Sequence, residues 1–107
     1  MIRLSLLAAS ILFFAAPAFA QAGKGDAALG EYLSSECVTC HQKSGQVTAG
    51  VPAIVGWPED QFVAVLQSYK DKHRDNVTMQ TIAGRLSAED MAALAAYFGK
   101  LKAPGHR

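Results

Sequence analysis

The most informative segment of this 107-residue chain is Cys37-Val38-Thr39-Cys40-His41. Two thiols separated by two residues, with an imidazole directly after them, match the attachment signal for c-type haem. Each thiol adds across one vinyl group of the porphyrin, and one turn of chain between the thiols spans the two vinyl positions. The next residue then lies under the iron, where a neutral imidazole nitrogen serves as a ligand. The sequence therefore predicts one covalent haem c held by Cys37 and Cys40, with His41 as an axial iron ligand.

Three other interpretations of a Cys-x-x-Cys pair compete with haem attachment: a thioredoxin-like redox motif, half of a zinc site and a plain disulfide. The redox motif requires a βαβ context, and the sequence contains no convincing strand pattern. A zinc site requires two more ligands at close spacing, whereas His73 and His106 are isolated. A disulfide suits an exported protein but leaves His41 without a role. Haem attachment is therefore the favoured hypothesis.

The first twenty residues have the pattern of a cleaved export signal. Met1-Ile2-Arg3 is a short basic start, an almost wholly apolar run extends to Phe14, and Ala18-Phe19-Ala20 provides a small-x-small cleavage pattern. The apolar run is short for a membrane span, and an uncleaved anchor is the alternative. We expect a signal peptide over residues 1–20, a single monohaem domain over residues 21–107, a periplasmic location and no integral membrane segment after cleavage.

The charge of the chain limits the kinds of partner. The sequence has ten Lys and Arg residues and nine Asp and Glu residues, so loss of Arg3 with the signal leaves nine of each. A near-neutral domain with no basic stripe is a poor partner for nucleic acid or for an anionic membrane surface. A domain this short also buries only a modest core, which a covalently held porphyrin would enlarge.

The apolar spacing predicts an all-α domain with three main helices. We expect the first helix to start after Asp26 and to run into the haem motif, and the second to open at Trp57-Pro58, with Pro58 in the first helical position. Ser87 should cap the last helix, with Asp90 as its capping-box partner. The second helix carries one apolar face of Phe62, Val65, Leu66 and Tyr69, and the last carries a stripe of Met91, Leu94, Phe98 and Leu101.

A basic cluster and a short helical stretch complete the pattern. Lys70, Lys72 and Arg74 gather at the carboxyl end of the second helix. Such a cluster is typical of a solvated helix end, and a docking patch is the alternative. Ile82 is expected to begin a brief helical stretch that closes at Gly84.

Met79 is the predicted second axial ligand of the iron. It is expected in a loop or short turn flanked by polar residues, where packing gives little reason for a thioether, whereas Met91 on an apolar stripe is expected to fill the core. Thioether ligation raises the reduction potential and suits electron transfer. His73 and His106 are the alternative ligands.

Pro52 lies in a short apolar loop that can support the histidine. A metal-bound histidine usually donates its other ring N–H to a carbonyl or carboxylate, which fixes the orientation of the ring. We expect the rigid loop at Pro52 to present such a carbonyl to His41. An ordinary turn is the alternative role of this proline.

Together these segments resemble class I cytochromes c, in the branch that contains cytochrome c4, c553-like domains and the cytochrome subunit of flavocytochrome c sulfide dehydrogenase. The resemblance extends over about residues 23 to 101. It is carried by the haem motif and by four further segments: Gly50-Val51-Pro52-Ala53-Ile54-Val55-Gly56, Asn76-Val77-Thr78-Met79, Leu86-Ser87-Ala88-Glu89-Asp90 and Ala96-Tyr97-Phe98.

The resemblance implies a small cytochrome c fold whose first and last helices cross near Gly30 and enclose haem c. It implies that Cys37 and Cys40 hold the vinyl groups, that His41 and Met79 hold the iron, and that Pro52 accepts the histidine N–H. Two departures stand out. Gln42 occupies a position where relatives often carry glycine, and one haem motif is present where the sulfide dehydrogenase subunit often has two.

The leading functional hypothesis is a one-electron carrier and not an enzyme. Within it, the resemblance favours a haem subunit that accepts electrons from an FAD-containing flavoprotein sulfide dehydrogenase. A freely diffusing carrier to an oxidase or photosynthetic centre is the alternative. Near-neutral charge favours an apolar contact over long-range steering of a partner. A haem sensor or catalytic haem domain forms a second class, and a haem-free zinc or disulfide module a third.

Overall fold

The computed structural model describes residues 8–13 and 25–102. Residues 8–13 are exposed and have no regular secondary structure, while the remainder of the expected signal and its cleavage site lie outside the described residues, as does His106. None of the helices in the described part of the chain is long and apolar enough to cross a membrane.

Helix α1 (Ala27–Leu33) begins where the sequence predicted it, after Asp26. The Asp26 carboxylate accepts the N–H groups of Ala28 and Leu29 at 2.9 and 3.3 Å, which satisfies two of the donors that a helix start leaves free. A short 3-10 turn, η1 (Ser34–Glu36), continues directly from α1 and ends at Cys37. The haem motif is therefore attached to the end of a helix, as expected.

Helix α2 (Glu59–Lys70) carries the predicted apolar face. Phe62 and Leu66 are buried, and Glu59 and Asp60 lie in the first turn, where the helix dipole favours negative charge. Pro58 was predicted as the first helical residue but is the N-cap, one position earlier.

The sequence prediction was wrong about the segment around Met79. Helix α3 (Val77–Gly84) starts well before Ile82, so that Met79 lies in its first turn and not in a loop. The Oδ1 atom of Asn76 accepts the N–H of Met79 at 2.9 Å and caps this helix. The helix has no acidic residue in its first turn and starts with two β-branched residues, so its sequence signal is weak.

Helix α4 (Ala88–Gly99) begins with the predicted capping box, in which Ser87 and Asp90 each bond the backbone N–H of the other at 3.0 Å. Met91, Leu94 and Phe98 of the predicted stripe are buried, and Met91 is fully so. Leu101 lies beyond the helix, which ends at Gly99. The four helices, with no named strand among the described residues, confirm the all-α class.

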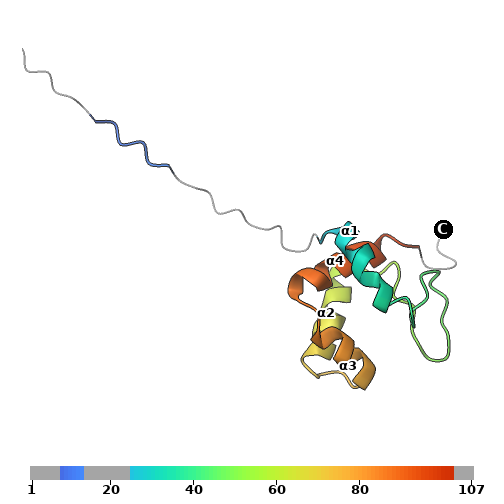
Figure 1. The fold of residues 1–107 in the computed structure, drawn as a ribbon. Coiled ribbons are helices and arrows are strands. Elements are labelled where there is room, and N and C mark those ends of the chain that lie inside the picture. The colour runs from blue at the N-terminus through green and yellow to red at the C-terminus, as the bar shows by residue number, and fades with distance from the viewer. Residues whose placement is uncertain (1–7, 14–24, 103–107) are drawn as a thin grey trace, which may run out of the picture.

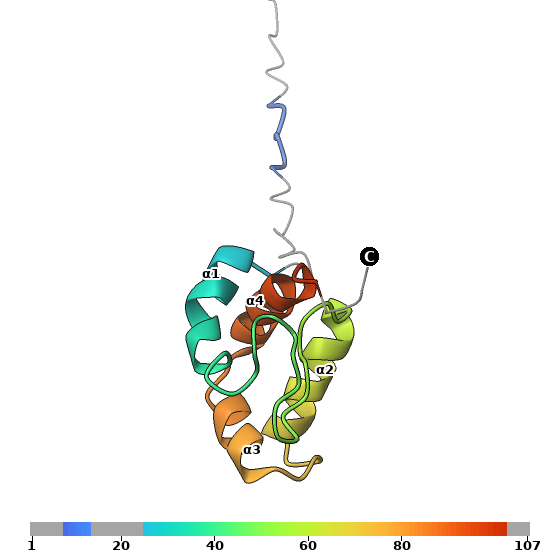
Figure 2. The same cartoon turned by 90° about the vertical axis from the view of Figure 1, so that its right-hand side faces the viewer.

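Helices α1 and α4 cross at a close contact that only glycine permits (Figures 1 and 2). A Cβ atom on Gly30 would lie 2.0 Å from the backbone oxygen of Ala93 and 2.7 Å from the Cβ of Tyr97. A Cβ atom on Gly25 would lie equally close to the backbone oxygen of Ala92. The expected crossing near Gly30 is therefore confirmed.

The long connection from α1 to α2 returns across the molecule in front of α4 (Figure 2). Its end is fixed by the N–H of Gly56, which donates to the backbone oxygen of Phe98 at 2.9 Å. Phe98 in turn stacks on Phe62 with ring centroids 5.7 Å apart. The apolar loop that contains Pro52 is thus held against the core, and it forms one wall of the cavity described next.

Candidate haem site

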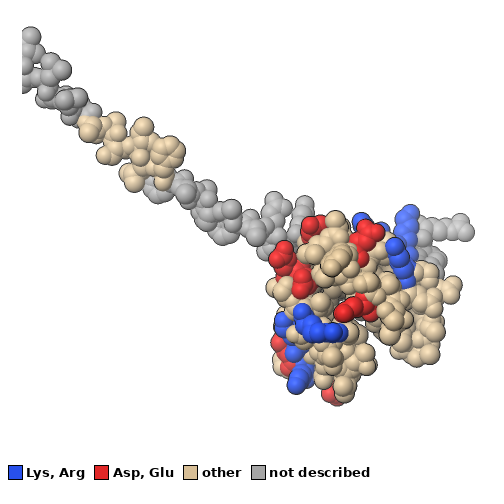
Figure 3. All heavy atoms as spheres, viewed as in Figure 1, with Lys and Arg blue, Asp and Glu red and all other residues tan. Residues whose placement is uncertain are grey.

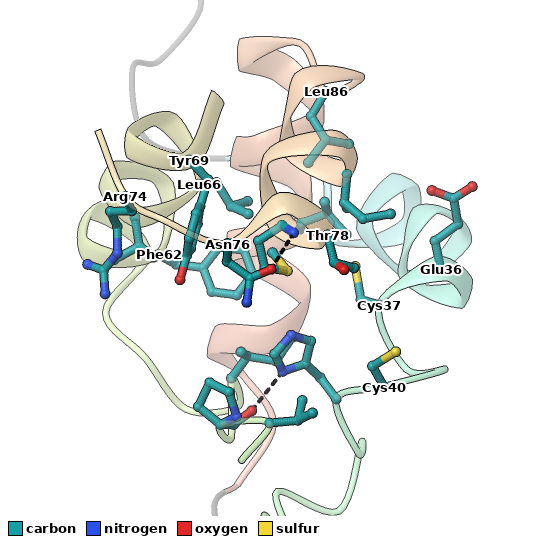
Figure 4. Close-up of a pocket in the computed structure, with 18 of the residues that line it drawn as sticks. Glu36, Cys37, Cys40, Phe62, Leu66, Tyr69, Arg74, Asn76, Thr78 and Leu86 are labelled. Atoms are coloured by element: carbon teal, nitrogen blue, oxygen red, sulfur yellow. Dashed lines mark hydrogen bonds between the residues drawn. The ribbon is translucent and has the colours of Figure 1, made fainter. Parts of the chain in front are cut away.

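One cavity of about 380 Å³ contains every residue that the sequence predicted for haem binding: Cys37, Cys40, His41, Pro52 and Met79 (Figure 4). These residues come from the end of η1, from the connection to α2 and from α3. Most of the remaining wall is apolar and consists of Val51, Ile54, Trp57, Phe62, Val65, Leu66, Ile82, Leu86 and Leu94. The predicted apolar face of α2 therefore faces this cavity. Apolar walls around two thiols, an imidazole and a thioether fit a flat apolar porphyrin that carries iron.

His41 is buried and is held by the hydrogen bond that the sequence predicted. Its Nδ1 atom lies 2.7 Å from the backbone oxygen of Pro52 (Figure 4). A carbonyl oxygen only accepts, so Nδ1 is the nitrogen that carries the hydrogen. In the neutral ring Nε2 then keeps its lone pair, which is the form that binds a metal.

Both cysteines are free thiols on the same side of the cavity (Figure 4). The backbone winds through the motif as a turn, with the N–H of His41 donating to the oxygen of Cys37 at 2.8 Å. Cys37 is partly buried and Cys40 is exposed. Burial, with a contribution from the negative charge of Glu36, raises the pKa of the Cys37 thiol to about 11.

The structure separates Met79 from the other candidate ligands. Met79 lines the cavity and is partly buried, whereas Met91 is completely buried in the core and lies outside the cavity wall. His73 is exposed and does not line the cavity. Of these side chains, Met79 alone shares the cavity with His41.

Sequence reasoning assigned no site role to four polar residues of the cavity wall: Glu36, Arg74, Asn76 and Thr78. The sequence analysis grouped Arg74 with a solvated helix end. Arg74 lies four residues beyond the end of α2, and the sequence does not show that the chain turns there towards the cavity. The sequence did contain a signal for Asn76, because asparagine is a preferred N-cap residue. Its side chain caps the helix that contains Met79.

The haem-free alternatives find no support in the geometry. No group of three or more His, Cys, Asp or Glu side chains is placed to hold a metal ion within the described residues. Cys37 and Cys40 are not joined to each other. The βαβ unit that a thioredoxin-like motif requires is likewise absent from the part of the chain that the structure describes.

The fold and the set of donor atoms define a class of protein, the small c-type cytochromes. No family model matches the sequence. The chain is 37% identical to cytochrome c-554(548) of Halomonas halodenitrificans over 78 residues, which is 69% of this chain and 94% of that protein. It is 30% identical to the cytochrome subunit of sulfide dehydrogenase of Chlorobaculum tepidum over 77 residues, which is 72% of this chain and 70% of that protein.

Longer proteins match as well. The chain is 38% identical to the thiosulfate dehydrogenase electron acceptor of Thiomonas intermedia over 96 residues, which is 88% of this chain but only 41% of that protein. Cytochrome c4 of Acidithiobacillus ferrooxidans has the same fold, with a TM-score of 0.67 and 22% identity over 77% of this chain and 53% of that one. The chain thus spans about half the length of the first relatives that it matches.

The chain belongs to the c-type cytochromes, and its fold is the one found in cytochrome c4. Members of this family are electron carriers and not enzymes, and their cofactor is covalent haem c. Cys37, Cys40 and His41 are the residues of this chain that match the attachment motif.

Proposed function

We propose that this protein is a periplasmic one-electron carrier in which Cys37 and Cys40 hold the haem and His41 and Met79 bind its iron. The observation that carries the proposal is the single apolar cavity that gathers these four side chains. When bound, the haem supplies a reversible Fe(II)/Fe(III) couple.

The surrounding residues suit electron transfer better than catalysis or sensing. With both His41 and Met79 bound to it, the iron would have no open site for a substrate or a gas. The hydrogen bond from His41 Nδ1 to Pro52 fixes the imidazole in one orientation. The apolar wall would keep water away from a bound haem and would limit the reorganisation that accompanies each change of charge.

Replacement of Met79 by alanine tests the ligand assignment. We expect Met79→Ala to lose the optical and NMR signatures of thioether ligation in the ferric protein, and its reduction potential should fall, because thioether ligation favours Fe(II). Met91→Leu is the matched control, since it removes a buried thioether that lies outside the cavity wall. Survival of the thioether signatures in Met79→Ala would assign the sixth ligand to another residue.

The domain boundaries are part of the same proposal. We propose that residues 1–20 direct export and are removed, which leaves one monohaem domain over residues 21–107. Amino-terminal sequencing of the exported protein should begin at Gln21, and pyridine haemochrome analysis should find one covalent haem per chain. A retained leader or a second haem would contradict this organisation.

We further propose that the electron donor is a dehydrogenase of reduced sulfur compounds, and specifically a flavoprotein that oxidises sulfide. Support comes from the relative named as the cytochrome subunit of sulfide dehydrogenase. The relatives named as thiosulfate dehydrogenase electron acceptors favour a second candidate, a thiosulfate dehydrogenase. The near-neutral charge of the domain suits a contact that does not depend on long-range attraction, and Figure 3 shows both signs of charge interspersed on one face.

Affinity capture from native periplasm separates these donors. A sulfide-oxidising flavoprotein should co-purify with this protein, with flavin fluorescence in the captured fraction and reduction of the haem on addition of sulfide. Reduction by thiosulfate without flavin in the fraction would favour the second candidate. Recovery of a lone monomer at both low and moderate salt would instead favour a diffusing carrier.

A further inference from the structure

The cavity wall carries charge at two opposite ends (Figure 4). Glu36 lies beside the cysteines, and its carboxylate pairs with Arg85 at 3.5 Å. Arg74 lies at the end away from the cysteines, close to Tyr69. Within the described residues Arg74 forms no ion pair, so its positive charge has no carboxylate partner there.

Haem brings negative charge to one edge only. The two vinyl groups lie towards one edge of the porphyrin, and its two propionate carboxylates lie together at the opposite edge. Attachment at Cys37 and Cys40 therefore determines which end of the cavity receives the carboxylates. That end is the one where Arg74 lies.

Hydrogen bonds fix the backbone around Arg74 on both sides. Helix α2 ends in a Schellman arrangement, in which Lys72 has a φ of 62° and the N–H groups of Lys72 and His73 donate to the oxygens of Tyr69 and Ser68 at 3.0 and 2.9 Å. On the other side, the Nε2 atom of Gln80 donates to the backbone oxygen of Arg74 at 2.9 Å. These bonds fix the segment that joins α2 to α3.

The side chain of Arg74 is also supported. Its Cζ atom lies 5.3 Å from the centre of the Tyr69 ring, within the range of a cation–π contact. The guanidinium presents several N–H donors in a planar fork, which matches the two oxygens of a carboxylate.

We propose that Arg74 binds the haem propionates and that its positive charge raises the reduction potential of the iron. This proposal rests on the haem site proposed above. Carboxylates near the iron stabilise Fe(III) over Fe(II), and a paired guanidinium offsets part of that effect. The role is distinct from attachment and from axial ligation, since neither the thioether bonds nor the iron ligands involve Arg74.

Replacement of Arg74 by glutamine tests the proposal. We expect Arg74→Gln to shift the Fe(III)/Fe(II) equilibrium towards Fe(III) by on the order of tenfold, which lowers the potential by about 59 mV for one electron. The resonance Raman bending mode of the propionates should shift in the same variant. Arg74→Lys keeps the charge without the planar fork, so we expect its potential to stay close to that of the wild type while the propionate mode still shifts.

Lys72→Gln is the matched control. Lys72 lies two residues before Arg74 and carries the same charge, but its side chain does not line the cavity. Equal changes of potential in Lys72→Gln and Arg74→Gln, or an unchanged propionate mode in both Arg74 variants, would overturn the proposal. The thioether signature of the ferric protein is measured in every variant, so a failure of the proposed axial ligation is seen separately. If Arg74→Gln does not retain haem, the propionate mode of Arg74→Lys decides the question.

Discussion

Gly30 sets how closely α1 can approach α4. The space that a side chain would need is already filled by the backbone of Ala93, which cannot rotate away as the end of a flexible side chain can. Helix propensity alone would favour alanine over glycine here by about 1 kcal/mol. The close contact of two backbones therefore outweighs propensity at this position.

Gly30→Ala should lower the free energy of unfolding of the haem-bound protein by about 3 kcal/mol, because overpacking at a backbone contact is relieved only by separating the two helices. The measurement is urea unfolding followed by circular dichroism. Gly84→Ala is the matched control, since Gly84 ends α3 and a Cβ there would meet no atom within 4 Å. The control should be stabilised by roughly 0.5–1 kcal/mol, and equal effects of the two substitutions would contradict the crossing.

At the scale of the single residue, the sequence predicted most of the site. We could infer the haem motif, Met79 and the carbonyl of Pro52, because haem attachment, iron ligation and a metal-bound histidine each require a particular chemical group. The structure places all of these residues around one cavity. The roles of these residues stay predictions until haem-bound protein is measured. Arg74 could not be inferred, because its place at the cavity depends on the path of the chain after α2 and not on its own chemistry.

At the scale of the helix, α3 is the one of the four described helices that carries a predicted iron ligand. Its first turn holds Met79, and its start depends on the Asn76 side chain. Like α1, which has seven residues, α3 is short, with eight, and isolated helices of that length are marginal in water. Its order therefore depends on the cap and on packing against α2, so loss of the cap should loosen Met79 before the rest of the fold.

Asn76→Ala should cost about 1 kcal/mol of stability, typical for loss of an N-cap, and should also lower the temperature at which the ferric thioether signature disappears. Asn76→Ser keeps a capping oxygen and should behave like the wild type. Ser87→Ala is the control at the start of α4; it costs a similar free energy but removes no contact to Met79. If Ser87→Ala lowered the temperature of thioether loss as much as Asn76→Ala does, α3 would not be a separate element of the ligand site.

The sequence predicted α1, α2 and α4 because each combines a cap or proline with apolar residues at helical spacing. It failed at α3, where Val77 and Thr78 are weak helix formers and the deciding interaction is one side-chain bond from Asn76. The crossing at Gly30 was implied only by the resemblance to class I cytochromes c. The spacing of apolar residues within one segment does not predict which distant segment it will contact.

At the scale of the whole molecule, the haem is a large part of the core. Without the haem, the apolar side chains around the cavity of about 380 Å³ would lack packing partners on one side. Small domains have about 5–15 kcal/mol of stability in total. The polypeptide by itself is therefore marginally stable at best.

Replacement of both Cys37 and Cys40 by alanine should give a product without covalent haem and without a cooperative unfolding transition in urea. Thr39→Ser is the matched control, since it lies between the cysteines and leaves both thiols. It should retain haem and unfold cooperatively. A stably folded haem-free double variant would argue for a haem-free module in place of the cytochrome.

The buried position of Cys37 has a consequence for the order of assembly. The thiolate is the reactive form of cysteine, and in the folded chain burial moves the pKa of this thiol from 9.0 to about 11. Near neutral pH this reduces the reactive fraction about a hundredfold relative to an exposed thiol. We therefore expect Cys37 to react with a vinyl group more readily before the chain has closed around it than after.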